Sequence, residues 1–407
     1  MKPPRGGEYS NMSLISHLPE IGAGIVGRAV TDTLYVSPEG AGTNGKTWGG
    51  AFTTIPAALA VASTDGDDLT LINISPHATN YDIDITGDPT YTGNYILKGS
   101  HRNWAKITNT NADNGGATSI LKFTGKVALI DLNFYLGTGL NGVIMTHGGV
   151  RVYNCQFVGE DLTGAATGLH LDHATGGKHA KVIDVDFKGD AEFMTALKID
   201  QFGYSNFERL RIHSSLKGIH ILGANSDQNI FSRVDIGDCD HANGIAIDID
   251  AGNEQHFHDI IFHHNKKNVD DEVKDHIWGN IFGQFPIEIL PADLDGHLVT
   301  AGDAASGIEA DWGTAVVFAA TDEIDYPFRI VAVHVEPTAN EWHELRFSVD
   351  SGAIYYDRVL FKGQKREGVA APSGTEFIFN ARVELYCQMR SETGGNDCQV
   401  WIEIQKI

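Results

Sequence analysis

The sequence predicts an all-β protein: a right-handed parallel β-helix followed by a small antiparallel β-sandwich that resembles a jelly roll. Three observations predict this fold class. Short apolar strands recur between residues 67 and 285, longer alternating strands fill residues 313–407, and glycine is frequent while proline is scarce, with 46 and 12 residues of 407. Such a composition favours short strands joined by turns over long helices.

Two interleaved series of short strands define the repeat, because both recur about every 26 residues. The first series comprises 121–123, 143–145, 169–171, 197–199, 219–221 and 245–247. The second comprises 130–132, 153–155, 183–185, 210–212, 234–236 and 260–262. This period indicates three strands per coil, with coils stacked about 4.8 Å apart and equivalent residues aligned in columns. One predicted inward column is Leu132, Cys155, Val185, Ile212, Ile236 and Phe262.

The sequence divides into four segments. We expect an N-terminal extension or docking segment at 1–33, the β-helix with its capping helix at 34–285, a linker at 286–312 and the sandwich at 313–407. The helix is predicted at 53–63, capped by Thr53 or Thr54 and with Pro56 in its first turn. Its apolar face is predicted to contain Trp48, Phe52, Ile55, Leu59 and Ala62, which are spaced by three or four residues.

The charge balance limits the partners of this chain. Acidic residues outnumber basic ones by 53 to 30, for a net charge of −23. Nucleic acid is therefore not expected as a partner, because phosphate binding requires clustered Lys and Arg. We expect no membrane span, since no apolar run approaches about 18 residues, and no signal peptide is seen in the first twenty residues.

The four cysteines fit no metal-binding pattern. Cys387 and Cys398 are predicted to lie opposite each other in the last β-hairpin. They can form a cross-strand disulfide or remain two reduced thiols in the core, and the sequence leaves both open.

The segment before and within the helix carries a family resemblance. It contains Tyr35-Val36-Ser37-Pro38, Gly40, Gly42, Asn44-Gly45, Thr47-Trp48, Ala51-Phe52, Thr54-Ile55 and Ala58-Leu59, followed by Gly66-Asp67. This pattern resembles the opening of pectate-lyase-like β-helix proteins, which include phage tailspikes, and the resemblance covers about residues 34–285. It implies a virion spike or fibre that is a homotrimer, docks to other virion proteins through its N-terminal segment and has a virion or extracellular location. The fold hosts enzymes as well as inert adhesins.

The outward positions of the first strand series contain the candidate site. One predicted column is Lys122, Ile144, His170, Lys198, His220 and Ala246, and its neighbour is Thr124, Thr146, Asp172, Asp200, Leu222 and Asp248. Asp172 and Asp200 would lie one coil apart, and Asp248 two coils beyond Asp200; at about 5 and 10 Å, these separations suit glycosidase carboxylate pairs. His170, Lys198 and His220 would bind sugar hydroxyls or act as acid or base. The alternative is an ordinary solvated face or a subunit interface.

Other outward residues suggest further chemistry. His256 and His258 share one face of a strand and are candidates for a His-bound metal, and acidic pairs are candidates for Ca²⁺, although no cofactor is required. A second outward series is predicted to contain Asp131, Asn154, Asp184, Arg211 and Asp235. On the sandwich, Trp342, with Tyr355 and Tyr356, suits sugar stacking or core packing.

Three functions remain open from the sequence. The first is a virion-associated structural and binding protein, a tail spike, fibre or capsid decoration that contacts a host-surface glycan or a neighbouring subunit. The second is a polysaccharide lyase or glycoside hydrolase that works in a groove along the β-helix. The third is a bacterial surface β-helix protein.

Overall fold

The computed structural model shows two compact units, which meet in sequence at residues 268 and 269 and are described separately. The structure describes residues 29–406 except 79, 85–89, 110–117, 138, 160–161, 163, 190–191, 193, 274–275, 284–286, 291–296, 301–311, 321–323, 325, 350–353, 363–366, 371–377, 381–382 and 393–394. Most of the predicted segment 1–33 therefore lies outside the described residues.

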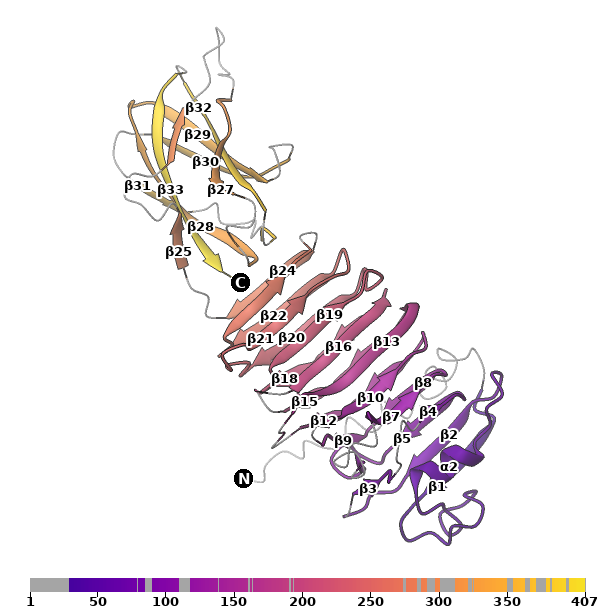
Figure 1. Ribbon diagram of the computed structural model, residues 1–407. Coiled ribbons are helices and arrows are strands. Elements are labelled where there is room, and N and C mark those ends of the chain that lie inside the picture. Colours follow the sequence, from indigo (N-terminus) through magenta and orange to yellow (C-terminus); the bar gives the residue numbers. More distant parts are fainter. Residues whose placement is uncertain are drawn as a thin grey trace, which may run out of the picture. The chain divides into compact units, whose positions relative to one another are not determined.

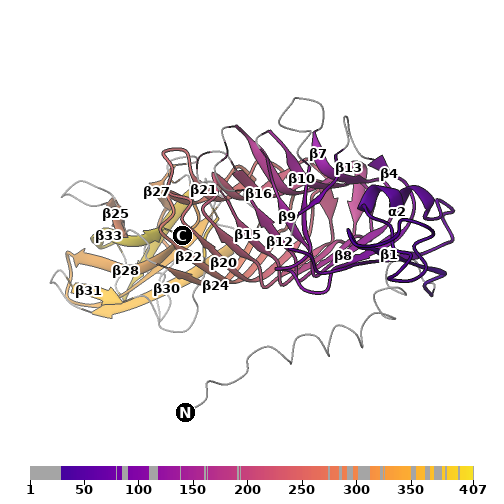
Figure 2. The same ribbon diagram turned by 90° about the horizontal axis from the view of Figure 1, so that it is seen from below.

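The first unit is a parallel β-helix, as predicted (Figure 1). Its strands form three parallel stacks, seen from another side in Figure 2. Stack 1 contains β4 (Thr90–Tyr91), β7 (Ser119–Phe123), β10 (Asn141–Met145), β13 (Ala166–Lys178), β16 (Met194–Gly203), β19 (Lys217–Leu222) and β21 (Ile245–Ile249). Because each of these strands pairs with its equivalent on the next coil, the two ends of the stack are the places where a whole strand edge needs a cover.

The other two stacks merge in the later coils. Stack 2 contains β1 (Asp32–Val36), β2 (Thr70–Ile74), β5 (Tyr95–Lys98), β8 (Val127–Ile130), β11 (Arg151–Tyr153), β14 (Lys181–Ile183) and β17 (Asn206–Glu208). Stack 3 contains β3 (Tyr81–Asp82), β6 (Lys106–Thr108), β9 (Asn133–Tyr135), β12 (Gln156–Val158), β15 (Asp186–Lys188) and β18 (Arg211–His213). The long strands β20 (Ile230–Gly237) and β22 (His256–His263) continue both stacks. Next along the chain are β23 (Lys267–Asp271) and β24 (Ile277–Gly283).

All six residues of the predicted inward column are buried, but in the structure they belong to two different columns. Asp186 pairs with Arg211, so Val185 lies beside Leu210 and not beside Ile212. Ile212 follows Phe187, and the same column continues through Ile236 and Phe262. Leu210 and Ile212 are both completely buried, so the apolar pattern alone does not distinguish the observed strand register from one shifted by two residues.

Stacked phenylalanines fill part of the β-helix interior. Phe207, Phe231 and Phe257 occupy equivalent positions on three coils and are fully buried. Their ring centroids are 4.7 and 4.8 Å apart, and adjacent rings are within 11° of parallel. The ring spacing matches the coil spacing, so one contact is repeated at each coil.

The N-terminal helix is shorter than predicted. Helix α2 spans Ile55–Val61; Thr54 is the N-cap, its side chain accepts a hydrogen bond from the Ala57 amide, and proline occupies the first turn. The helix lies beside β1 at the N-terminal end of the β-helix, where a cap is needed (Figure 1). The prediction that Trp48 and Phe52 extend the helical face was wrong. Phe52 forms a β-bridge with Val36, and Trp48 is 50% exposed.

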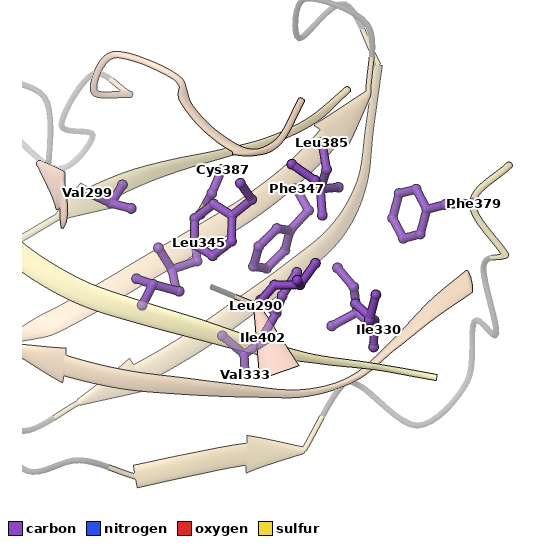
Figure 3. Packing of buried hydrophobic residues seen from close by; sticks show 14 of the residues in the cluster. Leu290, Val299, Ile330, Val333, Leu345, Phe347, Phe379, Leu385, Cys387 and Ile402 are labelled. Atoms are coloured by element: carbon purple, nitrogen blue, oxygen red, sulfur yellow. The ribbon is translucent and has the colours of Figure 1, made fainter. Parts of the chain in front are cut away.

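The C-terminal unit contains two antiparallel sheets, consistent with the predicted sandwich. One contains β25 (Ile287–Leu290), β33 (Asp397–Lys406), β28 (Phe328–Pro337) and β31 (Glu367–Ala370), with β26 (His297–Thr300) also paired to β33. The other contains β27 (Val316–Ala319), β32 (Leu385–Ser391), β29 (Trp342–Val349) and β30 (Ile354–Lys362). Their apolar residues form one buried cluster, which includes Val333, Phe347, Leu385 and Ile402 (Figure 3). Within the described residues, no helix is long and apolar enough to cross a membrane.

Two predictions for this unit need correction. The segment 286–312 is not simply a linker, because β25 and β26 pair with β33. Both strands have four residues, too few for alternation to distinguish a strand from a loop. The predicted last hairpin is also wrong: β32 and β33 belong to different sheets, although Cys387 and Cys398 are both buried in the shared core.

All four cysteines are free and buried in the structure. Burial raises the pKa of Cys155, Cys239 and Cys398 to about 12 and that of Cys387 well above its usual value. We therefore expect the native protein to react negligibly with a thiol reagent at pH 8, since the thiolate is the reactive form. Four thiols should react per chain in denaturant without reductant. Two reacting thiols would instead indicate a Cys387–Cys398 disulfide.

Candidate functional site

A row of polar and charged side chains crosses four consecutive coils on the outer face of stack 1. His170, Lys198, His220 and Asp248 occupy equivalent positions on β13, β16, β19 and β21. In the next outward column, Asp172 lies opposite Asp200, as predicted. We call these residues, together with Lys217 and Asp250, the polar face.

The coil that contains β21 departs from the predicted register. Asp248, and not Ala246, lies opposite His220, because Ile219 pairs with Ile247. Asp248 therefore belongs to the histidine column, and Asp250, which directly follows the last residue of β21, also reaches the histidine. Alternating isoleucines at 245, 247 and 249 are compatible with either register, so the sequence did not determine this choice.

The first cluster on the polar face contains His170, Asp172 and Asp200. Their nearest ligand atoms, one from each side chain, all lie within 4.8 Å of one another, and all three residues are half-buried. The Nε2 atom of His170 is buried and, within the described residues, has no hydrogen-bond partner. A rigid strand pair thus holds two carboxylates beside an imidazole.

The second cluster lies on the next two coils. His220 Nε2 is 2.9 Å from Asp250 Oδ2 and 3.4 Å from Asp248 Oδ2. The ammonium group of Lys217 forms an ion pair with Asp248 and lies 3.4 Å from His220 Nε2. Sequence reasoning missed Lys217 and the role of Asp250. The alternation of outward residues along β21, continued one residue past its end, could have indicated Asp250, but the position of Lys217 depends on the coil register.

A bulge and a glycine shape the polar face beside Asp200. The register of β13 against β16 shifts between Asp172 and Gly177, so the intervening residues leave the regular pairing. Gly223 has a left-handed φ of 76°, and a Cβ there would lie 2.6 Å from Asp200 Oδ1. Glycine at this position therefore leaves room for the Asp200 carboxylate.

The environment of His170 keeps its imidazole neutral. Burial lowers the pKa of His170 from 6.5 to about 4, and the nearby Lys198 adds to the effect. At neutral pH the side chain is therefore a hydrogen-bonding group and not a cation.

This pKa shift predicts a pH dependence of stability. Between pH 6.5 and about 4 the unfolded state binds the proton and the folded state does not, so the free energy of unfolding falls as the pH falls. The loss should not exceed about 1.4 kcal/mol per pH unit. Urea unfolding at several pH values should show a shallower decline for His170→Gln than for the wild type. Parallel curves for the two proteins would contradict the assignment.

Other predicted site residues lie elsewhere. His256 and His258 are on β22, with ring centroids 6.2 Å apart, and neither belongs to a three-residue metal-ligating group among the described residues. Trp342 is 47% exposed on β29, whereas the side chains of Tyr355 and Tyr356 are outside the described set.

The predicted second outward series needs two corrections, because Asp131 is buried and Asp184 and Arg211 are not equivalent residues of adjacent coils. The series places Arg211 directly after Asp184, whereas Asp184 forms an ion pair with Arg209. Arg211 instead pairs in register with Asp186 and Asp235.

Several solved structures are similar to this chain. No family model and no curated protein matches the sequence. Among solved structures, the chain is similar to pectate lyase Pel9A, at 16% identity and a TM-score of 0.42, over 60% of this chain and 68% of that one. It is also similar to Pantoea stewartii WceF, described as a glycan biofilm modifying enzyme with a bacteriophage tailspike-like parallel β-helix fold, at 8% identity and a TM-score of 0.35, over 81% and 54%. A third is an Acinetobacter phage tailspike protein, at 10% identity and a TM-score of 0.25, over 87% and 84%. The fold assignment itself rests on the strand order described above.

Proposed function

We propose that this chain is a structural and binding protein of the virion spike or fibre kind, whose polar face binds a host-surface polysaccharide. The single observation that supports this most is the array of acidic and basic groups on stack 1, in which His170, Lys198, His220 and Asp248 form one column across four coils and Asp172 and Asp200 lie in the next column. Carboxylates accept hydrogen bonds from sugar hydroxyls, and ammonium groups donate to them. A linear array of both suits a linear chain of hydroxylated units.

The scaffold also favours binding. The polar side chains of β13, β16 and β19 project from strands that are paired on both sides within the β-helix, so little backbone ordering is required when a ligand arrives. Trp342 on the C-terminal unit is a second candidate contact, since an exposed indole can stack on a sugar ring.

The remaining parts of the proposal follow from the sequence resemblance. We propose a homotrimer, docking to other virion proteins through the segment 1–33, and a virion or extracellular location. Light scattering of the purified chain measures the oligomeric state directly.

A polysaccharide-cleaving enzyme is the second candidate. It is favoured by the carboxylates of Asp172 and Asp200, which lie within 4.8 Å of each other and of His170. Retaining glycosidases hold their two carboxyl groups about 5–5.5 Å apart, one as nucleophile and the other as general acid. In this function His170, which is neutral at pH 7, would orient a hydroxyl of the substrate.

One experiment tests both candidates. The purified chain is incubated with immobilised and with soluble host capsular polysaccharide, and retention and new reducing ends are measured together. Retention of the chain on the polysaccharide without new reducing ends supports the binding function. New reducing ends or an unsaturated sugar product support the enzymatic function. If the chain is not retained and releases no product from any polysaccharide of the host surface, the proposal is wrong.

A further inference from the structure

We infer that His213, Asp238 and His263 form a binding site for a divalent transition metal ion such as Zn²⁺, away from the polar face. We call these three residues the His–Asp cluster. Their nearest ligand atoms, one from each side chain, all lie within 4.8 Å of one another, and the residues come from three consecutive coils. Two imidazoles with a carboxylate are a ligand set that suits Zn²⁺ better than Ca²⁺, which prefers oxygen.

The approach of the two histidine rings is the main observation. His213, Gly237 and His263 end β18, β20 and β22 and are paired in register, so the two histidines are two coils apart. Side chains projecting straight from such positions would be about 9.6 Å apart, twice the strand spacing. The two ring centroids are only 5.3 Å apart. The rings therefore converge across the intervening coil.

Gly237 makes this convergence possible. A Cβ at residue 237 would overlap the ring of His263, which lies over the glycine. In the same column on the preceding coil, Lys188 lies before His213, so the cluster is bounded on that side by a long basic residue. The absence of a side chain at 237 thus provides the space in which the two imidazoles meet.

Carboxylates surround the cluster. Asp238 Oδ2 is 3.8 Å from His213 Nδ1, and its other oxygen is 3.4 Å from Nδ1 of the exposed His264. Asp235 Oδ1 is 2.9 Å from His263 Nε2. If Asp235 accepts a hydrogen bond from the Nε2–H group of His263, the Nδ1 atom of that imidazole keeps a lone pair with which it can bind a metal ion. Metal-bound histidines commonly have such an outer carboxylate, which orients the ring.

The charge environment distinguishes this cluster from those on the polar face. There Lys198 lies opposite His170, and Lys217 forms an ion pair with Asp248, so each of those clusters has an ammonium group on a neighbouring position. In the described part of the chain, the ion-pair partners of Asp238 are histidines, with no lysine or arginine among them. The cluster is also half-exposed, so water can reach the ion and complete its coordination.

Calorimetric titration of the apo protein with Zn²⁺ tests the inference. We expect one tight site per chain, lost by more than about 100-fold in affinity in His213→Ala/His263→Ala, and weakened by about 10–100-fold in Asp235→Asn. The matched control is His256→Ala/His258→Ala, which removes two nearby histidines outside the cluster and should retain full affinity. Gly237→Ala keeps every ligand but displaces the His263 ring, and should lose the site.

Thermal unfolding distinguishes the loss of the metal site from the loss of the fold. Thermal unfolding in chelator should show that each variant compared is folded, and Zn²⁺ should raise the unfolding temperature of the wild type and the control but not of His213→Ala/His263→Ala. The inference is overturned if the wild type shows no saturable Zn²⁺ site. It is equally overturned if the control pair loses the site while the His213/His263 variant keeps it.

Discussion

Replacing Phe231 by alanine is expected to destabilise the β-helix by about 3–5 kcal/mol. Phe231 is completely buried between Phe207 and Phe257, so the truncation removes two ring contacts at once and leaves a cavity in the middle of the stack. The two neighbouring coils are fixed by strand pairing and cannot collapse fully into the space. For a unit of this size the loss corresponds to a fall of about 6–20 °C in the unfolding temperature.

Ile230→Ala provides the control for this experiment. Ile230 is the adjacent residue on β20 and is 44% exposed, so its truncation should change the free energy of unfolding by no more than about 0.5 kcal/mol. Circular dichroism during heating or urea titration measures both variants against the wild type. Similar losses for Phe231→Ala and Ile230→Ala would show that the phenylalanine stack does not stabilise the coils.

The double substitution Asp172→Asn/Asp200→Asn is expected to weaken polysaccharide binding by about 10–100-fold. Each carboxylate offers charge-assisted hydrogen bonds, which contribute about 1.5–3 kcal/mol each. The amide of asparagine has the same shape but carries no charge, so it retains only part of this binding free energy. The shape of the polar face should be preserved, because asparagine and aspartate have nearly equal volume. Calorimetry or surface binding with the polysaccharide retained in the first experiment measures the change.

The same variant separates the two candidate functions. If the chain cleaves its polysaccharide, the substitution removes both carboxyl groups of the reaction, and the rate should fall by at least about 10²–10⁴-fold. If the chain only binds, no product is formed by either protein and only the affinity changes.

The control variant must change the net charge by the same amount. Asp65→Asn/Asp240→Asn neutralises two exposed carboxylates on loops outside the polar face. It should bind and react as the wild type does. If this control loses as much affinity as Asp172→Asn/Asp200→Asn, the effect is one of overall charge, and the polar face is not the binding site.

Sequence patterns were most reliable where the same feature was repeated in many coils. The two strand series predicted the parallel β-helix, and the pairing of Asp172 with Asp200 followed from equal spacing of identical patterns. Predictions failed where the pattern tolerates a shift of two residues, as at Ile212 and Ala246, because side chains two apart on a strand point to the same face. Hydrophobic spacing also misled the helix prediction at Trp48, which lies in a loop.

The amino-acid sequence alone determined that the chain winds into parallel coils, since about every 26 residues it supplies apolar strands that can be buried only by stacking on their neighbours. The tertiary structure alone decided which polar groups meet. Asp248 joins His220, Cys387 and Cys398 lie on different sheets, and His213 approaches His263 over Gly237. The physical reason is that these contacts join residues on different coils or sheets, so they depend on turn lengths and register, which local periodicity does not specify.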